Sequence, residues 1–252
     1  MDAKAYLKRI KFSGIPGVDV DTLIKLHQHH VWNVPFENLD VQHGIKIRLE
    51  PSALFEKIVT RNRGGFCYEL NYLFHDFLVH LGFTAKLISA RIFNGKELGP
   101  KFDHMAVLVT IAQEHWLADV GFGDLFVSPL RIGTADEQYD GRTYFKIVRT
   151  HRKELSLQMR SKDSKFENKY LFDTDSHDIT AFASQCEYKQ HSPDSHFVKN
   201  KIVTLPYQEG RKTIFNSKYI CRSGADKTEY TITSEKEEVR ILKEAFQIDF
   251  GF

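Results

Sequence analysis

The chain has 252 residues, enough for one large domain or about two to three small ones around a substantial core. Hydrophobic residues make up 42% of it and charged residues 27%, and 35 Lys and Arg against 33 Asp and Glu give a net charge of +2. That balance argues against extensive binding to nucleic acid or to a membrane surface. No apolar run approaches the roughly 20 residues needed to span a bilayer.

The cysteine pattern and the N-terminus bear on where the protein works. Cys67, Cys186 and Cys221 are an odd number, lie far apart and include no C-x-x-C pair. A disulfide framework or a structural zinc site is therefore not expected. Residues 1–12 mix charged and apolar side chains, unlike a signal peptide or a transit sequence. Together these features predict a reduced, cytoplasmic protein.

Residues 1–82 are predicted to be mainly helical. Apolar side chains at three- and four-residue steps indicate the helices, with Asp19 or Asp21 placed to cap the first. Pro51 suits the first turn of a helix because its ring fixes φ. Gly82 can adopt the positive φ that ends a helix. The expected helices run over residues 20–30, from 51 to about 58, and from just after Gly64-Gly65 to 81.

From residue 84 the apolar period changes to two, which indicates strands. These are expected at residues 84–92, 105–111, 115–120, 143–149 and 154–159. Beyond residue 160 the signals weaken, and the expected elements are a helix start within 176–182, a loop at 191–197, a hairpin around Glu209-Gly210, and an amphipathic helix over 235–246. Helices, then strands, then a mixed segment predict an α+β protein.

Cys67 follows two glycines in the run RGGFCYELN, residues 63–71. Gly64-Gly65 let the backbone turn sharply and approach a ligand closely. The expected helix start places the thiol where unpaired N–H groups and the helix dipole favour a thiolate and an oxyanion. A lone cysteine is most often a buried structural residue. This context instead favours a nucleophile.

A thiolate nucleophile needs a base, and the base needs an orienting group. His104 and Asp119 fit these roles if the strands at 105–111 and 115–120 form a hairpin. With an even-numbered loop, paired positions sum to an odd number, so residues 104 and 119 share one face. A four-residue loop would pair Asp119 with Ala106, about 7 Å along the strand from His104. An odd loop would defeat this argument unless a bulge restored the register.

Several motifs resemble those of the arylamine N-acetyltransferases, and they occur in the family's order between about residues 34 and 216. RGGFCYELN followed by a His and by DVGFG is highly specific, whereas VPFEN alone is only suggestive. The matching segments are VPFENLD at 34–40, RGGFCYELN at 63–71, His104-Met105, ADVGFGD at 118–124, and more weakly SPDSHFVKN at 192–200 and EGR at 209–211.

The resemblance implies a three-part architecture with a cysteine-protease-like core. A helical bundle (1–82) would carry the nucleophile, a β-barrel (83–190) the His and Asp, and an α/β lid would follow (191–252). It also implies ping-pong chemistry, in which Cys67 takes an acetyl group from the co-substrate acetyl-CoA as a thioester and passes it to an arylamine or arylhydrazine. His104 would accept the thiol proton and Asp119 would orient the imidazole. The resemblance further implies a role in xenobiotic metabolism, and the absence of the long insertion of vertebrate members suggests a prokaryotic-type enzyme.

The same resemblance suggests substrate contacts. Gly121, Phe122 and Gly123 would lie near the active-site mouth and the CoA pyrophosphate, where glycines can expose backbone N–H groups to phosphate. A tight turn is the simpler explanation of a lone G-F-G. Phe36 and Phe122 would line the acceptor pocket, although most Phe residues serve only the core.

Two further groups have mainly structural interpretations. Glu37 and Arg63 could form a buried ion pair that holds the cysteine loop against the helical bundle. His27, His29 and His30 do not share one helix face and have no cysteine nearby, so no metal site is expected.

Three functions remain in competition at this stage. The first is CoA-dependent N-acetyl transfer. The second is another thiol acyl-transfer enzyme, such as an amide synthase, a transglutaminase-like protein or a papain-like hydrolase, which shares the Cys, His, Asp order. The third is a non-catalytic binding module of the same fold, against which the complete triad argues. VPFEN and DVGFG around the triad favour the first.

Overall fold

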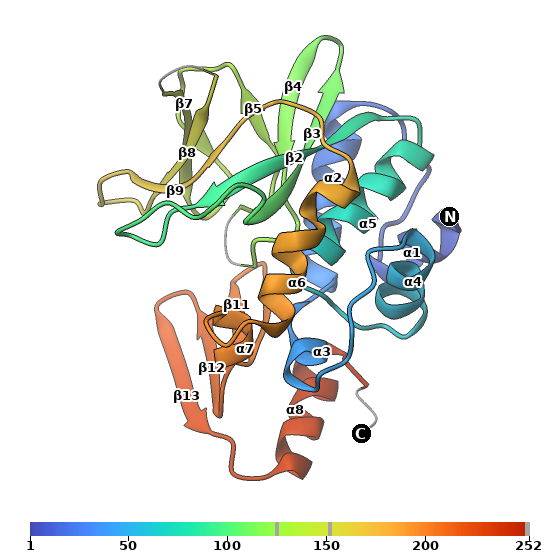
Figure 1. Ribbon diagram of the computed structural model, residues 1–252, viewed down its shortest axis with the longest axis vertical. Coiled ribbons are helices and arrows are strands. Elements are labelled where there is room, and N and C mark those ends of the chain that lie inside the picture. The colour runs from blue at the N-terminus through green and yellow to red at the C-terminus, as the bar shows by residue number, and fades with distance from the viewer. Residues whose placement is uncertain (124–125, 151–152, 250–252) are drawn as a thin grey trace.

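The computed structural model describes residues 1–123, 126–150 and 153–249. In Figure 1, α1, α2, α4 and α5 gather on the right. One sheet lies at the upper left and a second sheet at the lower left. The N-terminal helices are α1 (Ala3–Arg9), α2 (Val20–Asn33), α3 (Leu39–Gln42), α4 (Pro51–Phe55), which continues as a π-helical turn (Glu56–Thr60), and α5 (Cys67–His80).

The helix boundaries follow the local chemistry of the sequence. Asp19 caps α2, because its Oδ1 accepts a hydrogen bond of 2.8 Å from the N–H of Thr22. Pro51 is the first residue of α4. Gly82 follows α5 with φ of +96°, the conformation that closes a helix without strain on a side chain. These predictions are confirmed.

The larger sheet has eight strands in the order β5-β4-β3-β2-β9-β8-β7-β6, and every neighbouring pair is antiparallel. It curves into a nearly closed, barrel-like sheet around its own apolar core, which includes Leu117, Phe145 and Tyr170. Its strands are β2 (Thr84–Ile92), β3 (His104–Ile111), β4 (Glu114–Ala118), β5 (Leu130–Ile132), β6 (Gln138–Tyr139), β7 (Tyr144–Arg149), β8 (Leu155–Arg160) and β9 (Glu167–Phe172).

The smaller sheet joins one strand of the N-terminal region to four strands of the C-terminal region. Its order is β1-β10-β11-β12-β13, so a strand from the helical region forms one edge. Helix α8 (Glu235–Phe246) packs on this sheet through Leu242 and Phe246. The strands are β1 (Phe36–Glu37), β10 (Ile202–Tyr207), β11 (Gly210–Phe215), β12 (Lys218–Ser223) and β13 (Asp226–Thr231).

Three short helical segments lie between the sheets in the chain. They are a 3-10 turn (Ile179–Phe182), α6 (Ala183–His191) and α7 (His196–Lys199). Figure 1 shows α6 running from the larger sheet towards the smaller one. No helix within the described ranges is long and apolar enough to cross a membrane.

The α+β prediction is confirmed, and the hairpin loop has an even number of residues, the condition on which the argument for residues 104 and 119 depended. Only Ala112 and Gln113 connect β3 to β4, both with positive φ, and Val107 pairs with Ala118. Two residues of this conformation make the tight turn that matches the twist of a hairpin. The pairing sums are odd, as the argument for residues 104 and 119 required. The strand itself ends at Ala118, so Asp119 lies just beyond it.

One local prediction needs correction. Residues 191–197 are not all loop, because α7 begins at His196, where Ser195 caps it by accepting a hydrogen bond of 3.2 Å from the N–H of Phe197. The hairpin predicted around Glu209-Gly210 is confirmed, because β10 and β11 pair there, and β12 and β13 extend it. Every residue of β13 is exposed, so its sequence, DKTEYT, lacks the apolar alternation that marks a half-buried strand.

Candidate active site

Cys67 is the first residue of α5, and its side chain is almost completely buried. Both preceding glycines are required by close packing. A Cβ on Gly64 would lie 2.0 Å from the carbonyl oxygen of Pro35, and one on Gly65 would lie 2.8 Å from the Cβ of Glu69. The glycines therefore allow the chain to pass beside β1 and enter the helix at the thiol.

His104 and Asp119 come together as the hairpin register predicts. The imidazole Nε2 donates to Asp119 Oδ2 over 2.7 Å, and both side chains are buried. Because Nε2 is engaged with the carboxylate, Nδ1 is the nitrogen available to Cys67, whose side chain interacts with His104 and raises its pKa. The structure thus places the imidazole of His104 between the side chains of Cys67 and Asp119.

The electrostatics of this cluster favour an imidazolium. Burial alone would lower the pKa of His104, but the carboxylate of Asp119 and the Cys67 side chain together raise it to about 10. Burial would likewise raise the pKa of Asp119, but the facing His104 and hydrogen bonds from Asn71 and Gly121 lower it below its usual value. A buried Cys-His-Asp cluster of this kind can activate a thiol as a nucleophile.

Three residues for which the sequence predicted no role in the site hold Asp119. Asn71 Nδ2 donates to Oδ1 over 2.8 Å, and the hydroxyl of Tyr170 donates to Oδ2 over 3.2 Å. His27 Nε2 accepts the backbone N–H of Asp119 over 3.1 Å. Asn71 could have been found, since it lies four residues after Cys67 and therefore on the same helix face. Tyr170 is on β9, where no strand was predicted.

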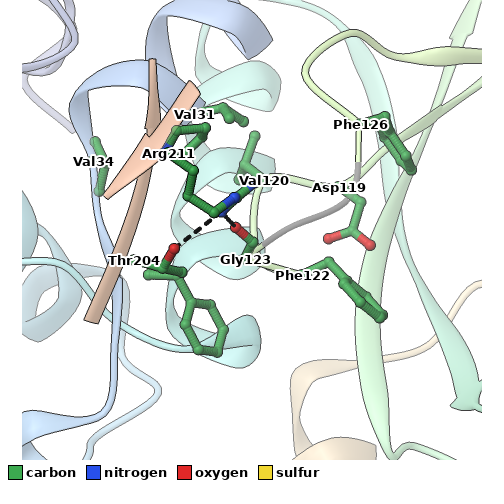
Figure 2. Close-up of a pocket in the computed structure, with 11 residues that line it drawn as sticks. Val31, Val34, Asp119, Val120, Phe122, Gly123, Phe126, Thr204 and Arg211 are labelled. Atoms are coloured by element: carbon green, nitrogen blue, oxygen red, sulfur yellow. Dashed lines mark hydrogen bonds between the residues drawn. The ribbon is translucent and has the colours of Figure 1, made fainter. Parts of the chain in front are cut away.

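A small cavity opens beside this cluster, and Figure 2 shows the side chains that line it. Phe122 contacts the imidazole of His104 edge to face, with centroids 5.3 Å apart. The lining residues are Val31, Val34, Phe36, Asp119, Val120, Phe122, Gly123, Phe126, Thr204, Pro206 and Arg211. These residues come from α2 and its C-terminal end, from the segment after β4, and from β1, β10 and β11 of the smaller sheet. The helical region and both sheet regions therefore border the cavity.

The glycines of the G-F-G run have steric reasons for their places. A Cβ on Gly121 would lie 2.9 Å from Cys67 Cα, and Gly123 has φ of +91° and faces the ring of Phe36. Arg211 Nη1 donates to the carbonyl of Gly123 and, over 3.1 Å, to Thr204 Oγ1 (Figure 2). The residues predicted to contact substrate therefore lie beside Cys67, His104 and Asp119. Residue 124, the last of the ADVGFGD motif, lies outside the described residues.

Glu37 and Arg63 form a buried, charge-assisted pair. Glu37 Oε1 accepts from Arg63 Nε over 3.0 Å and from Nη2 over 2.7 Å. Asp40 accepts from the same guanidinium over 2.8 Å, and Lys57 bridges Asp40 at 2.8 Å to Glu69 at 2.7 Å. This network joins β1 and α3 to both sides of the cysteine loop. The Glu37–Arg63 pair therefore lies where it can hold that loop against the helical bundle, as expected.

The histidines of α2 have protein partners. His27 and His30 are fully buried, and His30 Nδ1 shares a hydrogen bond of 2.7 Å with the Tyr6 hydroxyl. His29 Nδ1 lies 3.2 Å from the carbonyl of Ile10. No group of three His, Cys, Asp or Glu that could hold a metal ion occurs among residues 1–123, 126–150 and 153–249.

Comparison with known proteins assigns the chain to a family. An N-acetyltransferase family model matches residues 19–252. Arylamine N-acetyltransferase, pineal gland isozyme NAT-10, of Gallus gallus is 30% identical over 273 residues, covering 98% of this chain and 94% of that protein. The chain belongs to the arylamine N-acetyltransferase family. It is therefore an acyltransferase.

Bacterial relatives agree with this assignment. Arylamine N-acetyltransferase of Escherichia coli is 31% identical over 210 residues, covering 82% of this chain and 74% of that protein. The arylamine N-acetyltransferase structure from Salmonella typhimurium superposes with a TM-score of 0.93 at 26% identity, covering 99% of this chain and 92% of that one. The Mycobacterium marinum enzyme in complex with CoA superposes with a TM-score of 0.90 at 26% identity, covering 98% and 93%.

Proposed function

We propose that this member of the arylamine N-acetyltransferase family transfers acetyl groups from acetyl-CoA to arylamines and arylhydrazines by a ping-pong mechanism through an acetyl-Cys67 thioester. The observation that carries the proposal is the buried His104–Asp119 pair at 2.7 Å, in contact with a cysteine at the first position of α5. A thiol, a base and an orienting carboxylate are the parts that covalent acyl transfer requires.

In the first half-reaction, Cys67 Sγ attacks the thioester carbonyl of acetyl-CoA after its proton has passed to His104. Asp119 stabilises the resulting imidazolium, which is why the raised pKa of His104 supports this role. First-turn N–H groups of α5 lack helical partners and can stabilise the oxyanion. When the tetrahedral intermediate collapses, the C–S bond to CoA breaks and the CoA thiolate takes the proton from His104.

In the second half-reaction, the amine nitrogen attacks the acetyl-Cys67 carbonyl. Neutral His104 accepts the proton that the nitrogen loses, and the Cys67 thiolate leaves as the new amide forms. Phe36 and Phe122 line the adjoining cavity, where their rings can pack against an aromatic acceptor. The same thiolate–imidazolium pair is restored at the end of the cycle.

We also propose that Gly121, Phe122 and Gly123 lie against bound CoA, since they border this cavity and the fold matches that of a CoA complex.

We further propose that residues 1–82, 83–190 and 191–252 form three domains. The order of helices and sheets supports them, although β1 lies in the C-terminal sheet and Cys186 of α6 packs in the first core. Three free cysteines agree with a cytoplasmic location.

The test is intact-mass analysis after incubation with acetyl-CoA and no acceptor. We expect one acetyl adduct on the wild type and none on Cys67→Ala. Cys186→Ala is the matched control, because it removes another buried thiol and should still acquire the adduct. Absence of the adduct on wild type, together with turnover of peptide or glutamine amides, would replace acetyl transfer with another thiol acyl-transfer reaction. Subsequent addition of an arylamine should remove the adduct and release its N-acetyl product.

A further inference from the structure

His27 of α2 lies next to Asp119 and connects α2 to the main chain of two residues in the larger sheet region, Asp119 and Val127. Its Nε2 accepts the N–H of Asp119 over 3.1 Å, and its Nδ1 donates to the carbonyl of Val127 over 2.9 Å. Because a main-chain N–H can only donate and a carbonyl can only accept, these two bonds fix the neutral tautomer with the proton on Nδ1. The ring therefore contacts the catalytic aspartate through its backbone.

The ring cannot turn to make other bonds. It is fully buried, stacked on Phe126 with centroids 5.7 Å apart and an interplanar angle of 17°, and set edge to face against Phe74 at 6.0 Å. Burial lowers the pKa of His27 to about 4. The imidazole is therefore neutral at physiological pH, as its two hydrogen bonds require.

The far end of this connection is also anchored. The N–H of Val127 donates to Asp140 Oδ2 over 3.0 Å, and Asp140 Oδ1 accepts the N–H groups of Arg142 and Thr143. A series of hydrogen bonds thus runs from the residues just before β7 through Asp140, Val127 and His27 to Asp119. From there it continues to the imidazole that faces Cys67.

We propose that His27 is a positioning residue for the acyl-transfer reaction, which sets the place of Asp119 relative to His104 by holding the aspartate's main chain. The inference rests on the proposed function, because it assigns a role within the same triad. Asn71 and Tyr170 fix the carboxylate oxygens, whereas His27 fixes the backbone from which that carboxylate extends. Without it, a buried N–H and a buried carbonyl lose their partners, and Asp119 gains freedom to move away from His104.

The experiment compares three variants of the full chain. His27→Leu removes both hydrogen bonds, and His27→Gln retains one donor and one acceptor on a single carbon, as the imidazole does. His30→Leu is the matched control, since His30 is equally buried in α2 and also packs edge to face on Phe74, but bonds to Tyr6 instead of Asp119. All are assayed at a temperature below their unfolding midpoints.

We expect His27→Leu to lower kcat by about 10- to 100-fold with little change in the KM for acetyl-CoA, since a displacement on the order of 1 Å costs about that much. His27→Gln should recover part of this rate. His30→Leu should lower the unfolding midpoint by a similar amount yet keep kcat within about threefold of wild type. Equal kcat losses in His27→Leu and His30→Leu, or a wild-type rate in His27→Leu, would overturn the inference.

A second readout separates this inference from the proposed function. Iodoacetamide alkylation of Cys67 across pH reports the thiolate–imidazolium pair without any acetyl donor. In His27→Leu the onset of alkylation should move to higher pH, because a displaced Asp119 stabilises the imidazolium less. The other ionisable groups that act on His27 are Asp140 and His30, and His30→Leu controls for the latter. If wild type forms no acetyl-Cys67, the proposed function fails while this profile still decides the role of His27.

Discussion

Removing the guanidinium of Arg63 tests the buried charge network that holds the cysteine loop. Arg63→Ala removes two hydrogen bonds to Glu37 and one to Asp40, and Glu37 is fully buried. Breaking one partner out of a buried ion pair costs about 3–5 kcal/mol because a charge is left without compensation. Lys57 remains 2.8 Å from Asp40 and 4.0 Å from Glu37, which offsets part of the loss. We therefore expect a loss near the lower end, about 3 kcal/mol.

Arg61 provides the matched control two residues away. It pairs with Glu56 at 3.2 Å, but its side chain is 70% exposed. Arg61→Ala should therefore change the free energy of unfolding by about 0–1 kcal/mol. Urea unfolding monitored by circular dichroism measures both variants, with midpoints compared at equal slope. If Arg63→Ala lost no more stability than Arg61→Ala, the network would not hold the loop and the reasoning would be wrong.

Three further predictions concern the site itself. Gly121→Ala places a Cβ 2.9 Å from Cys67 Cα, so it should cost about 1–3 kcal/mol in thermal unfolding and slow Cys67 alkylation; a wild-type alkylation rate would contradict this. Asp119→Asn should lower kcat by about 10⁴-fold, because His104 loses its counter-charge, and a loss under tenfold in steady-state assays would exclude the triad role. His27 has its pKa lowered to about 4 from 6.5, so the unfolded chain binds more protons between these values and stability falls as pH drops from 6.5 to 4. His27→Gln should remove up to about 3 kcal/mol of that acid sensitivity in urea titrations at several pH values, and unchanged sensitivity would refute the assignment.

The nucleophile region was predictable because short-range rules decide it. Gly64-Gly65, Cys67 and Gly82 specify a sharp turn, a helix start and a helix end, and each acts within a few residues of its own position. The meeting of His104 and Asp119 was predictable because a side-chain period of two makes the parity of one short loop sufficient. Neither feature depends on contacts between residues far apart in the sequence.

The remaining parts depend on long-range contacts that leave little local signal. Tyr170 reaches Asp119 only because β9 pairs with β2 and β8, and the strand's sequence, ENKYLF, has weak alternation. His27 looks like any histidine on an apolar helix face until the main chain of Asp119 is placed against it. The network around Lys57 likewise depends on three acidic residues from separate segments. Sequence patterns record the period of one element, not the partner it meets.

The pairing of β1 with β10 has a consequence for biosynthesis. Phe36 lies opposite Thr204, and both line the cavity beside the triad. A ribosome releases the first of these residues long before the second, and contacts so far apart in sequence form late in folding. The cysteine, the imidazole and the carboxylate can therefore meet while the side of the cavity formed by β10 and β11 is still missing. A nascent chain halted before β10 would carry Cys67, His104 and Asp119 without the residues of β10 and β11 that complete this cavity.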